Sequence, residues 1–368
     1  KPVILAGRGV IISGAFPELK ELAEKAQIPV ITTSLGIGCF PEDHILSLGM
    51  IGMHGMAYAN MAVSSADLII AIGMRFDDRA TGKVSGFAPH AQIIHIDIDP
   101  AEIGKNVRVD VPIVGDVKNV LTELNKFIDV RTHVDWIAQV EEWRRDHPVV
   151  VIRECDELLP QFVIRKIYEV TQGNAIIVTG VGQNQMWAAQ HFWYNKPNTL
   201  ISSGGLGTMG FELPAAIGAK VGKPDETVWA VAGDGGFQMT IQELATAAQD
   251  NIAVKIAILN NGFLGMVRQW QELFYKKNYV ATPLSNPDFV KVAEAYGVPG
   301  IRVTDKKLAV AAIQRAMEHE GPFLIDFVVE PEENIYPMVA PGCSLAEIIE
   351  APWNKVKIKA GSQETSNL

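Results

Sequence analysis

The sequence predicts an α/β protein made of two doubly wound domains, each built on a parallel sheet. Short runs of apolar and β-branched residues alternate with helical stretches along most of the 368 residues. Continuous apolar strands joined by helical crossovers are typical of parallel sheets that are covered on both faces, and not of half-exposed hairpins. A segment at 129–160, rich in charge and tryptophan, separates two such sets of strands. We therefore expect two domains joined by a helical linker.

The expected domain boundaries follow from these patterns. The first domain occupies 1–128, the linker 129–160 and the second domain 161–340. Beyond these, the periodicity fades, so 341–368 is expected to be a C-terminal tail that ends in a polar stretch at 355–368. The expected strands are, in the first domain, 3–6, 29–32, 68–72, 93–98 and 112–114, and, in the second, 175–179, 227–232, 254–259 and 323–329.

The composition argues against several classes of function. The chain has 32 Lys and Arg against 42 Asp and Glu, a formal net charge of −10, and no dense basic run, so neither nucleic acid nor an anionic membrane is an expected partner. No apolar run approaches the ~18 residues of a membrane span. Cys39, Cys155 and Cys343 form no CxxC pair, which favours reduced thiols over a disulfide framework or a zinc cluster. We expect a cytoplasmic protein.

Polar residues follow two strands of the second domain. The strand at 227–232 runs into Gly233-Asp234-Gly235-Gly236 and then a helix from about 240 to 249, and the next strand ends in Asn260-Asn261-Gly262. The Asp and the Asn should lie side by side at the carboxyl edge of the sheet, where open α/β sheets bind ligands.

These residue types suit a metal-anchored diphosphate. Glycines let the backbone approach a phosphate, a following helix N-terminus favours anions, and Asp and Asn oxygens are suitable ligands for Mg²⁺. The alternative is a tight turn and a loop that bind nothing. Because both motifs directly follow apolar strands, with one helix between them, the ligand site is the favoured interpretation.

The two motifs together resemble the signature of thiamine-diphosphate-dependent enzymes. The resemblance implies that Asp234, Asn261 and the main-chain oxygen of Phe263 bind Mg²⁺. Three further stretches, at 178–187, 202–210 and 265–270, resemble the large catalytic subunits of acetolactate synthases (acetohydroxyacid synthases).

The second resemblance assigns roles around thiamine diphosphate. It places Gln183 and Asn184 at the diphosphate, the Gly207 carbonyl at the aminopyrimidine amine and Met209 between the two rings of the cofactor. Trp270, which shares a helix face with Met266, would select the size of the second 2-keto acid. Ordinary core packing is the alternative for Met209 and for Trp270. The remaining cofactor residues implied are Gly204, Thr208, Gly233, Gly235, Gly236, Leu264, Gly265 and Met266.

The first domain resembles the FAD-binding central domain of the same family. The stretches that carry this resemblance are 7–9, 49–55, 73–79 and 95–106. It implies contacts with FAD from Gly7, Arg8, Gly9, Thr33, Ser34, Ile51, Gly52, Met53, His54, Gly73, Met74, Arg75, Phe76, Asp77, Asp97, Ile98, Gly115 and Asp116.

Two residues of the first domain have open interpretations. Arg79 is the candidate for gripping the acceptor's carboxylate, and a salt bridge to Asp77 or Asp78 is the alternative. A structural role for His54 is as plausible as a ligand contact.

The resemblance implies a complete reaction. Pyruvate would be decarboxylated with thiamine diphosphate and joined to a second 2-keto acid, giving 2-acetolactate, or 2-aceto-2-hydroxybutyrate from 2-oxobutyrate. This is the first common step of branched-chain amino acid (valine, leucine and isoleucine) biosynthesis. The resemblance also implies thiamine diphosphate, Mg²⁺ and FAD as cofactors, a homo-oligomer (dimer or tetramer) with sites shared between subunits, and a small regulatory subunit.

One family feature has no counterpart in these residues. The chain opens almost on a strand without an initiator Met, so we expect a piece of a longer polypeptide. The glutamate that protonates the aminopyrimidine ring belongs to the family's N-terminal domain, and the chain alone is therefore expected to be inactive.

Three other functions are alternatives. Another thiamine enzyme, such as pyruvate oxidase, glyoxylate carboligase or a 2-keto-acid decarboxylase, would share the cofactor site, but the pairing of Arg79 with Trp270 argues for an acceptor site. A non-catalytic nucleotide-binding module would have no need of Met209 beside the metal ligands. An NAD-linked dehydrogenase would leave the Asp and Asn motifs unused.

Overall fold

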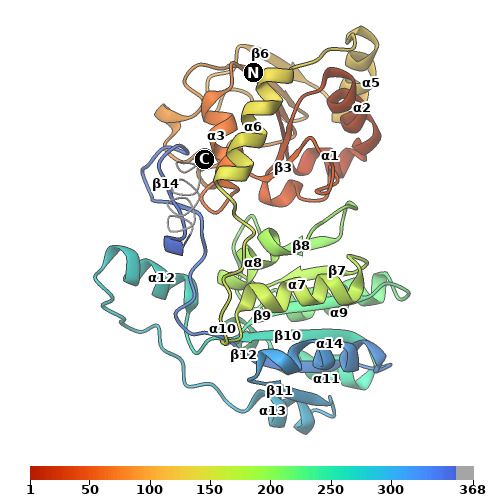
Figure 1. The fold of residues 1–368 in the computed structure, drawn as a ribbon. Coiled ribbons are helices and arrows are strands. Elements are labelled where there is room, and N and C mark those ends of the chain that lie inside the picture. Colours follow the sequence, from red (N-terminus) through yellow and green to blue (C-terminus); the bar gives the residue numbers. More distant parts are fainter. Residues whose placement is uncertain (354–368) are drawn as a thin grey trace, which may run out of the picture. The chain divides into compact units, whose positions relative to one another are not determined.

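The computed structural model describes residues 1–353, and the polar stretch expected at 355–368 lies outside them. The chain divides into two compact units (Figure 1). The first unit contains Lys1–Arg153, Tyr194–Pro197 and the described residues from 336 to 353; the second contains Glu154–Trp193 and Asn198–Ile335. No helix within residues 1–353 is long and apolar enough to cross a membrane.

The first unit is a doubly wound sheet in the order β3-β2-β1-β4-β5-β6, and every neighbouring pair is parallel. On β1, Val3 and Leu5 join the core on one face, and Ile4 and Ala6 join the core on the other. The strands are β1 (Pro2–Ala6), β2 (Val30–Thr32), β3 (Ser47–Met50), β4 (Leu68–Ile72), β5 (Gln92–Asp97) and β6 (Val111–Val114).

Helices cover both faces of this sheet. One face packs against α1 (Arg8–Ser13), α2 (Phe16–Ala26) and α5 (Val117–Phe127). The other packs against α3 (Ala57–Ser65) and α6 (Val134–Asp146). The shorter elements are η1 (Ser34–Gly36), α4 (Asp78–Thr81) and η2 (Val84–Gly86).

Two segments from outside the expected first domain pack within this unit. The Trp136 indole of α6 donates a hydrogen bond to the Pro2 carbonyl at 3.0 Å. Residues from the C-terminal part of the chain form an antiparallel pair, β13 (Met338–Val339) and β14 (Ile348–Ile349), and the Val339 N–H donates to the Met53 carbonyl at 2.8 Å. Part of the segment predicted as a tail is therefore ordered structure.

The second unit has the sheet order β11-β12-β10-β9-β7-β8, again wholly parallel. Its strands are β7 (Ile176–Thr179), β8 (Leu200–Ser202), β9 (Val228–Gly233), β10 (Val254–Asn260), β11 (Gly300–Val303) and β12 (Phe323–Val328). Its helices are α7 (Pro160–Thr171), α8 (Gln183–His191), α9 (Glu212–Gly222), α10 (Asp234–Met239), η3 (Ile241–Glu243), α11 (Leu244–Gln249), α12 (Gly265–Phe274), α13 (Phe289–Ala295), η4 (Lys306–Leu308) and α14 (Ala309–Glu318).

The predicted fold class, two parallel α/β sheets, is confirmed. Three strands of the two parallel sheets were not expected, namely β3, β8 and β11, and all three lie at sheet edges; the short pair β13 and β14 was not expected either. The helix expected from about 240 to 249 is present as η3 followed by α11, and a separate short helix that was not expected, α10, precedes it from Asp234, with Gly233 as its N-cap. The Asp of the glycine-rich motif is thus the first residue of a helix.

Candidate functional site

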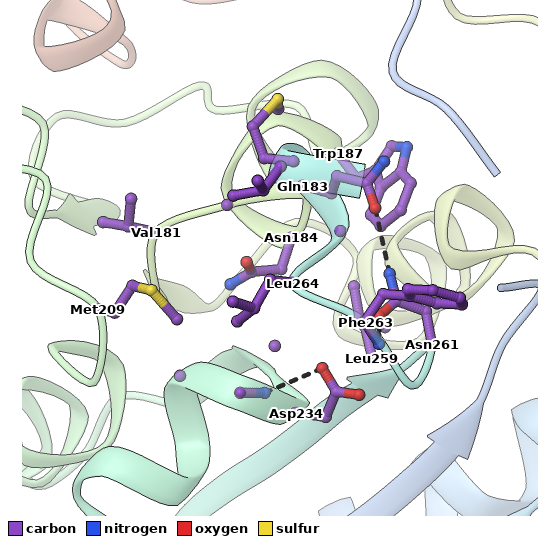
Figure 2. Close-up of a pocket in the computed structure, with 17 residues that line it drawn as sticks. Val181, Gln183, Asn184, Trp187, Met209, Asp234, Leu259, Asn261, Phe263 and Leu264 are labelled. Carbon is purple, nitrogen blue, oxygen red and sulfur yellow. Dashed lines mark hydrogen bonds between the residues drawn. The ribbon is translucent and has the colours of Figure 1, made fainter. Parts of the chain in front are cut away.

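The ends of β9 and β10 form one wall of a pocket in the second unit. These strands are parallel neighbours, with Gly233 in register with Leu259, so Asp234 and Asn261 follow them at the same edge of the sheet. The pocket is partly open to solvent, and the centres of water-sized molecules can occupy about 90 Å³ of it. Figure 2 shows the Asp234 and Asn261 side chains at this pocket.

Backbone and side-chain donors hold the Asp234 carboxylate in place. Its Oδ1 accepts from the Gly235 N–H at 2.9 Å, and its Oδ2 accepts from the Gly262 N–H at 2.8 Å and from Asn286 Nδ2 at 2.7 Å. Burial raises the pKa of Asp234, and these hydrogen bonds act in the opposite direction. A bound cation would compensate the negative charge of the Asp234 carboxylate, which burial has separated from water.

The Asn261 carboxamide is buried and also held at both ends. Its Nδ2 donates to Gln183 Oε1 at 3.1 Å, and its Oδ1 accepts from the Phe263 N–H at 3.1 Å. Phe263 forms an isolated bridge with Pro283, which fixes the backbone of the loop after β10. Within residues 1–353, no group of three or more His, Cys, Asp or Glu side chains could hold a metal, so a cation here would depend on one carboxylate with amide and main-chain oxygens.

Three helices begin at this pocket. Their first residues, Gln183 of α8, Asp234 of α10 and Gly265 of α12, all line it. Helix N-termini present unpaired N–H groups and a partial positive charge, which favours a diphosphate. The donor set and these termini together fit Mg²⁺ and thiamine diphosphate.

Glycine is required where α12 meets the amide pair. A Cβ atom on Gly265 would lie 2.1 Å from Gln183 Oε1 and 2.7 Å from Asn261 Nδ2, between two atoms that are hydrogen-bonded to each other (Figure 2). Gly235 is similarly confined, because a Cβ there would lie 2.9 Å from a methyl carbon of Leu264.

Gly265→Ala is therefore expected to separate the Gln183 and Asn261 side chains and to weaken Mg²⁺-dependent binding of thiamine diphosphate by about tenfold. Titration of the apo-protein by calorimetry would measure this. Gly218→Ala is the matched control, since a Cβ at Gly218 of α9 meets no atom within 4 Å. Equal affinities in the two variants would contradict the expectation.

Most of the second-domain residues predicted from the sequence line this pocket. They are Gln183, Asn184, Met209, Gly233, Asp234, Gly235, Gly236, Asn261, Phe263, Leu264, Gly265 and Met266. Figure 2 shows Met209 on the side of the pocket away from Asn261.

Other predicted residues lie outside its lining. Gly204, Gly207 and Thr208 belong to an exposed turn, in which the Gly207 N–H donates to the Ser203 carbonyl at 2.9 Å. Trp270 is half-buried, one turn beyond Met266, with its ring 5.6 Å from that of Phe274.

Family models match both units. The model for the central domain of thiamine pyrophosphate enzymes matches residues 1–124, and the model for their C-terminal TPP-binding domain matches residues 180–327. The chain belongs to the thiamine pyrophosphate enzymes. The second match includes all the pocket residues described above.

Relatives of this chain within the family are named as acetolactate synthases. It is 50% identical over 363 residues to the acetolactate synthase large subunit of Mycobacterium tuberculosis, and 49% identical over 360 residues to that of Corynebacterium glutamicum; each comparison covers 95% of this chain and 58% of the relative. A probable acetolactate synthase large subunit of Methanocaldococcus jannaschii is 48% identical over 369 residues, covering 98% of this chain and 62% of that protein. The resemblance indicated by the sequence motifs is confirmed, and the chain spans about three-fifths of these relatives.

In this thiamine pyrophosphate enzyme, the residues predicted to contact FAD follow the carboxyl ends of the six strands of the first unit. The strand order reverses between β1 and β4, and the loops after these strands approach closely. A Cβ on Gly9 would lie 2.6 Å from Gly73 Cα, and a Cβ on Gly7 would lie 2.2 Å from the Gly73 carbonyl oxygen. Doubly wound sheets bind dinucleotides at such a reversal, and these glycines let the two loops meet there.

Several polar residues of these loops have structural partners. Asp77 is the N-cap of α4 and accepts from the Arg79 and Ala80 N–H groups, and Asp116 is the N-cap of α5. The Arg79 guanidinium lies 3.5 Å from Asp78 Oδ2 and is largely exposed. Burial lowers the pKa of His54 to about 4, so the ring is neutral at pH 7; its Nδ1 lies 3.3 Å from the Pro337 carbonyl oxygen.

Five residues at the pocket were not predicted as site residues. Asn286, in the irregular segment before α13, donates to Asp234, and the pocket is also lined by Val181, Trp187, Leu259 and Val267. Trp187 lies in the stretch at 178–187 that carried the resemblance, whereas no pattern singles out Asn286.

Proposed function

We propose that this chain forms the metal–diphosphate half of an acetolactate synthase active site together with an FAD-binding domain. The observation that carries the proposal is the pairing of Asp234 and Asn261 at neighbouring strand ends, in a chain about 50% identical to acetolactate synthases. The reaction would join pyruvate, after loss of CO₂, to a second pyruvate or to 2-oxobutyrate, giving 2-acetolactate or 2-aceto-2-hydroxybutyrate.

The residues of the pocket have complementary roles in this proposal. Asp234, the Asn261 carboxamide oxygen and the Phe263 carbonyl oxygen would hold Mg²⁺, while Gln183 and Asn184 and the helix N-termini would bind the diphosphate. Met209 would support the bent form of the cofactor. Bound thiamine diphosphate supplies an electron sink for the decarboxylation.

The first unit would contribute the FAD site and an acceptor contact. Arg79, whose side chain is largely exposed, would bind the acceptor carboxylate in place of Asp78. The overall reaction involves no net oxidation, so we propose a structural role for FAD. We also propose a cytoplasmic homo-oligomer with shared sites and a small regulatory subunit.

A product assay tests the proposal. The full-length protein that contains this chain would be incubated with pyruvate, 2-oxobutyrate, FAD, thiamine diphosphate and Mg²⁺, alongside the chain alone. Acetolactate from the full-length protein would support the proposal. Acetaldehyde or hydrogen peroxide as the main product would assign the protein to another thiamine enzyme activity. Cofactor binding without turnover of either 2-keto acid would instead favour a binding module.

Trp270→Leu is expected to lower the preference for 2-oxobutyrate over pyruvate as acceptor by several-fold, because Leu would remove the half-buried indole surface against which the extra methyl group of 2-oxobutyrate would pack. The ratio of the two products at equal acceptor concentrations measures this preference. Tyr275→Leu, which removes an exposed aromatic ring just beyond the same helix, is the control. An unaltered product ratio would leave Trp270 with a packing role only.

A further inference from the structure

Only the oxygen of the Asn261 carboxamide can bind a cation. The side chain must therefore place this oxygen, and not its NH₂ group, toward the pocket. The two ends of a carboxamide have nearly the same shape, and the hydrogen-bond partners around it decide which end faces a ligand. Asn261 donates through Nδ2 to Gln183 Oε1 at 3.1 Å. If the Gln183 amide were reversed, its NH₂ group would meet the Asn261 NH₂ group, and only the Phe263 N–H, which donates to Asn261 Oδ1 at 3.1 Å, would oppose a turn of the Asn261 nitrogen toward the pocket.

The orientation of Gln183 depends in turn on Gln269. Gln183 Nε2 donates to Gln269 Oε1 and to the Glu333 carbonyl, both at 3.0 Å. A reversed Gln183 would place its oxygen against these two acceptors. Gln183 and Gln269 are almost completely buried, so replacing these hydrogen bonds would require water in a closed interior.

The orientation of Gln269 is set by main-chain groups that cannot be reversed. Its Nε2 donates to the Ile335 carbonyl at 3.0 Å, and its Oε1 accepts from the Ile335 N–H at 2.8 Å. A main-chain N–H can only donate and a carbonyl can only accept. The Ile335 backbone therefore determines the orientation of the Gln269 amide, and Gln269 determines that of Gln183. Gln183 in turn favours the orientation of Asn261 in which its NH₂ group faces Gln183.

The main-chain segment at the start of this series is itself tightly held. Arg268 is fully buried and donates to the Glu333 carbonyl at 2.9 Å and to Asn334 Oδ1 at 2.7 Å. The same guanidinium pairs with Glu272 at 2.6 Å. The segment at 333–335 is thus bound to α12 through two consecutive helix residues, Arg268 and Gln269.

We propose that Gln269, which does not line the pocket, is a positioning residue that acts through Gln183 to keep the Asn261 oxygen directed at the cation. The inference rests on the metal–diphosphate site of the proposed function, but not on acetolactate as the product. A purely structural role, in which Gln269 only joins α12 to the segment at 333–335, is the competing explanation.

The primary test is the Mg²⁺ concentration that gives half-maximal binding of thiamine diphosphate to the apo-protein, followed by tryptophan fluorescence because Trp187 lines the pocket. Gln269→Met keeps the length of the side chain and removes its hydrogen bonds. We expect this variant to need about tenfold more Mg²⁺, a loss typical of partners that orient metal ligands.

The matched control is Gln271→Met on the same helix. Gln271 makes the same type of paired contact, donating to the Val280 carbonyl at 3.0 Å and accepting from the Val280 N–H at 3.2 Å and from Thr282 Oγ1 at 3.1 Å, but none of these partners is Gln183 or Asn261. A Mg²⁺ requirement that rises equally in both variants would overturn the proposal. Urea unfolding of each variant would separate a loss of stability from a loss of metal affinity.

A double-mutant cycle distinguishes positioning from packing. If Gln269 acts through Gln183, Gln269→Met should have no further effect on the Mg²⁺ requirement in a Gln183→Ala background. Independent, additive effects would overturn the proposal. Because the measurement is cofactor binding, a failure here is distinguishable from a failure of the proposed function, which would appear as intact Mg²⁺-dependent binding with no acetolactate formed.

Discussion

Asp234→Asn is expected to weaken Mg²⁺-dependent binding of thiamine diphosphate by at least about 100-fold. Asp234 supplies the one negative charge among the proposed cation ligands, and the substitution removes that charge while keeping the size of the side chain. It also places an NH₂ group near the Gly262 N–H and the Asn286 NH₂ group. In the unsubstituted protein, both of these donors are hydrogen-bonded to the Asp234 carboxylate. Both changes act against a bound cation.

Calorimetric titration with thiamine diphosphate, with and without Mg²⁺, would measure the loss. Asp250→Asn is the control, since Asp250 is exposed at the end of α11 in the same unit. Asp234→Ala should lose the Mg²⁺ dependence as well, and the thermal transition of each variant would show that the fold is retained. If Asp234→Asn bound the cofactor with an unchanged Mg²⁺ dependence, the metal assignment would be wrong.

The adjacency of Asp234 and Asn261 could be predicted because it follows from parallel topology alone. Each residue directly follows a strand with a continuous apolar run, and the carboxyl ends of adjacent parallel strands share one edge. The contributions of Asn286 and Gln269 could not be predicted in this way. Asn286 lies in an irregular segment, and the contact of Gln269 depends on where the segment at 333–335 passes.

The three sheet strands that were not predicted lack the long continuous run of apolar residues by which the other strands were recognised. Central strands such as β9 and β10 are buried on both faces and consist almost entirely of apolar residues. The edge strands β8 and β11 are partly exposed and contain Ser202 and Arg302, so their runs are short and mixed. β3 is buried but contains Gly49 with φ of 70°, a conformation that no strand propensity anticipates.

The short helix α10 was not expected from the sequence. Glycine is a poor helix former, which is why a helix through Gly235 and Gly236 was not expected. The structure needs glycine at both positions for space: a Cβ on Gly236 would lie 2.8 Å from Glu212 Oε1, and a Cβ on Gly235 would meet Leu264 and Leu284. Close packing around the pocket thus overrides local propensity.

Glu212 itself is a buried charge that no sequence pattern explained. It lies in the first turn of α9 with no exposed surface, and among the residues that the structure describes neither carboxylate oxygen has a hydrogen-bond partner. Gly180 and Gly236 leave the space that its oxygens occupy. Burial raises the pKa of Glu212 from 4.5 to about 7, against a smaller opposite effect of the Glu212 and Gly210 backbones.

The direction of the pH dependence follows from this raised pKa. Between pH 4.5 and pH 7 the folded protein keeps the proton that the unfolded chain releases, so Glu212 makes stability fall as the pH rises. Above pH 7 the full cost is present, about 3 kcal/mol for a shift of this size. Below pH 4.5 the carboxyl group is neutral in both the folded and the unfolded state, so burying it carries no cost of burying a charge.

Glu212→Gln is therefore expected to raise the free energy of unfolding by about 3 kcal/mol at pH 8 and to change it little at pH 4.5. Urea unfolding of both proteins at the two pH values measures the difference. Glu226→Gln, at an exposed position of the same unit, controls for the loss of one negative charge and should show no such pH dependence. The same stability difference at both pH values would contradict a raised pKa of Glu212 in the folded protein.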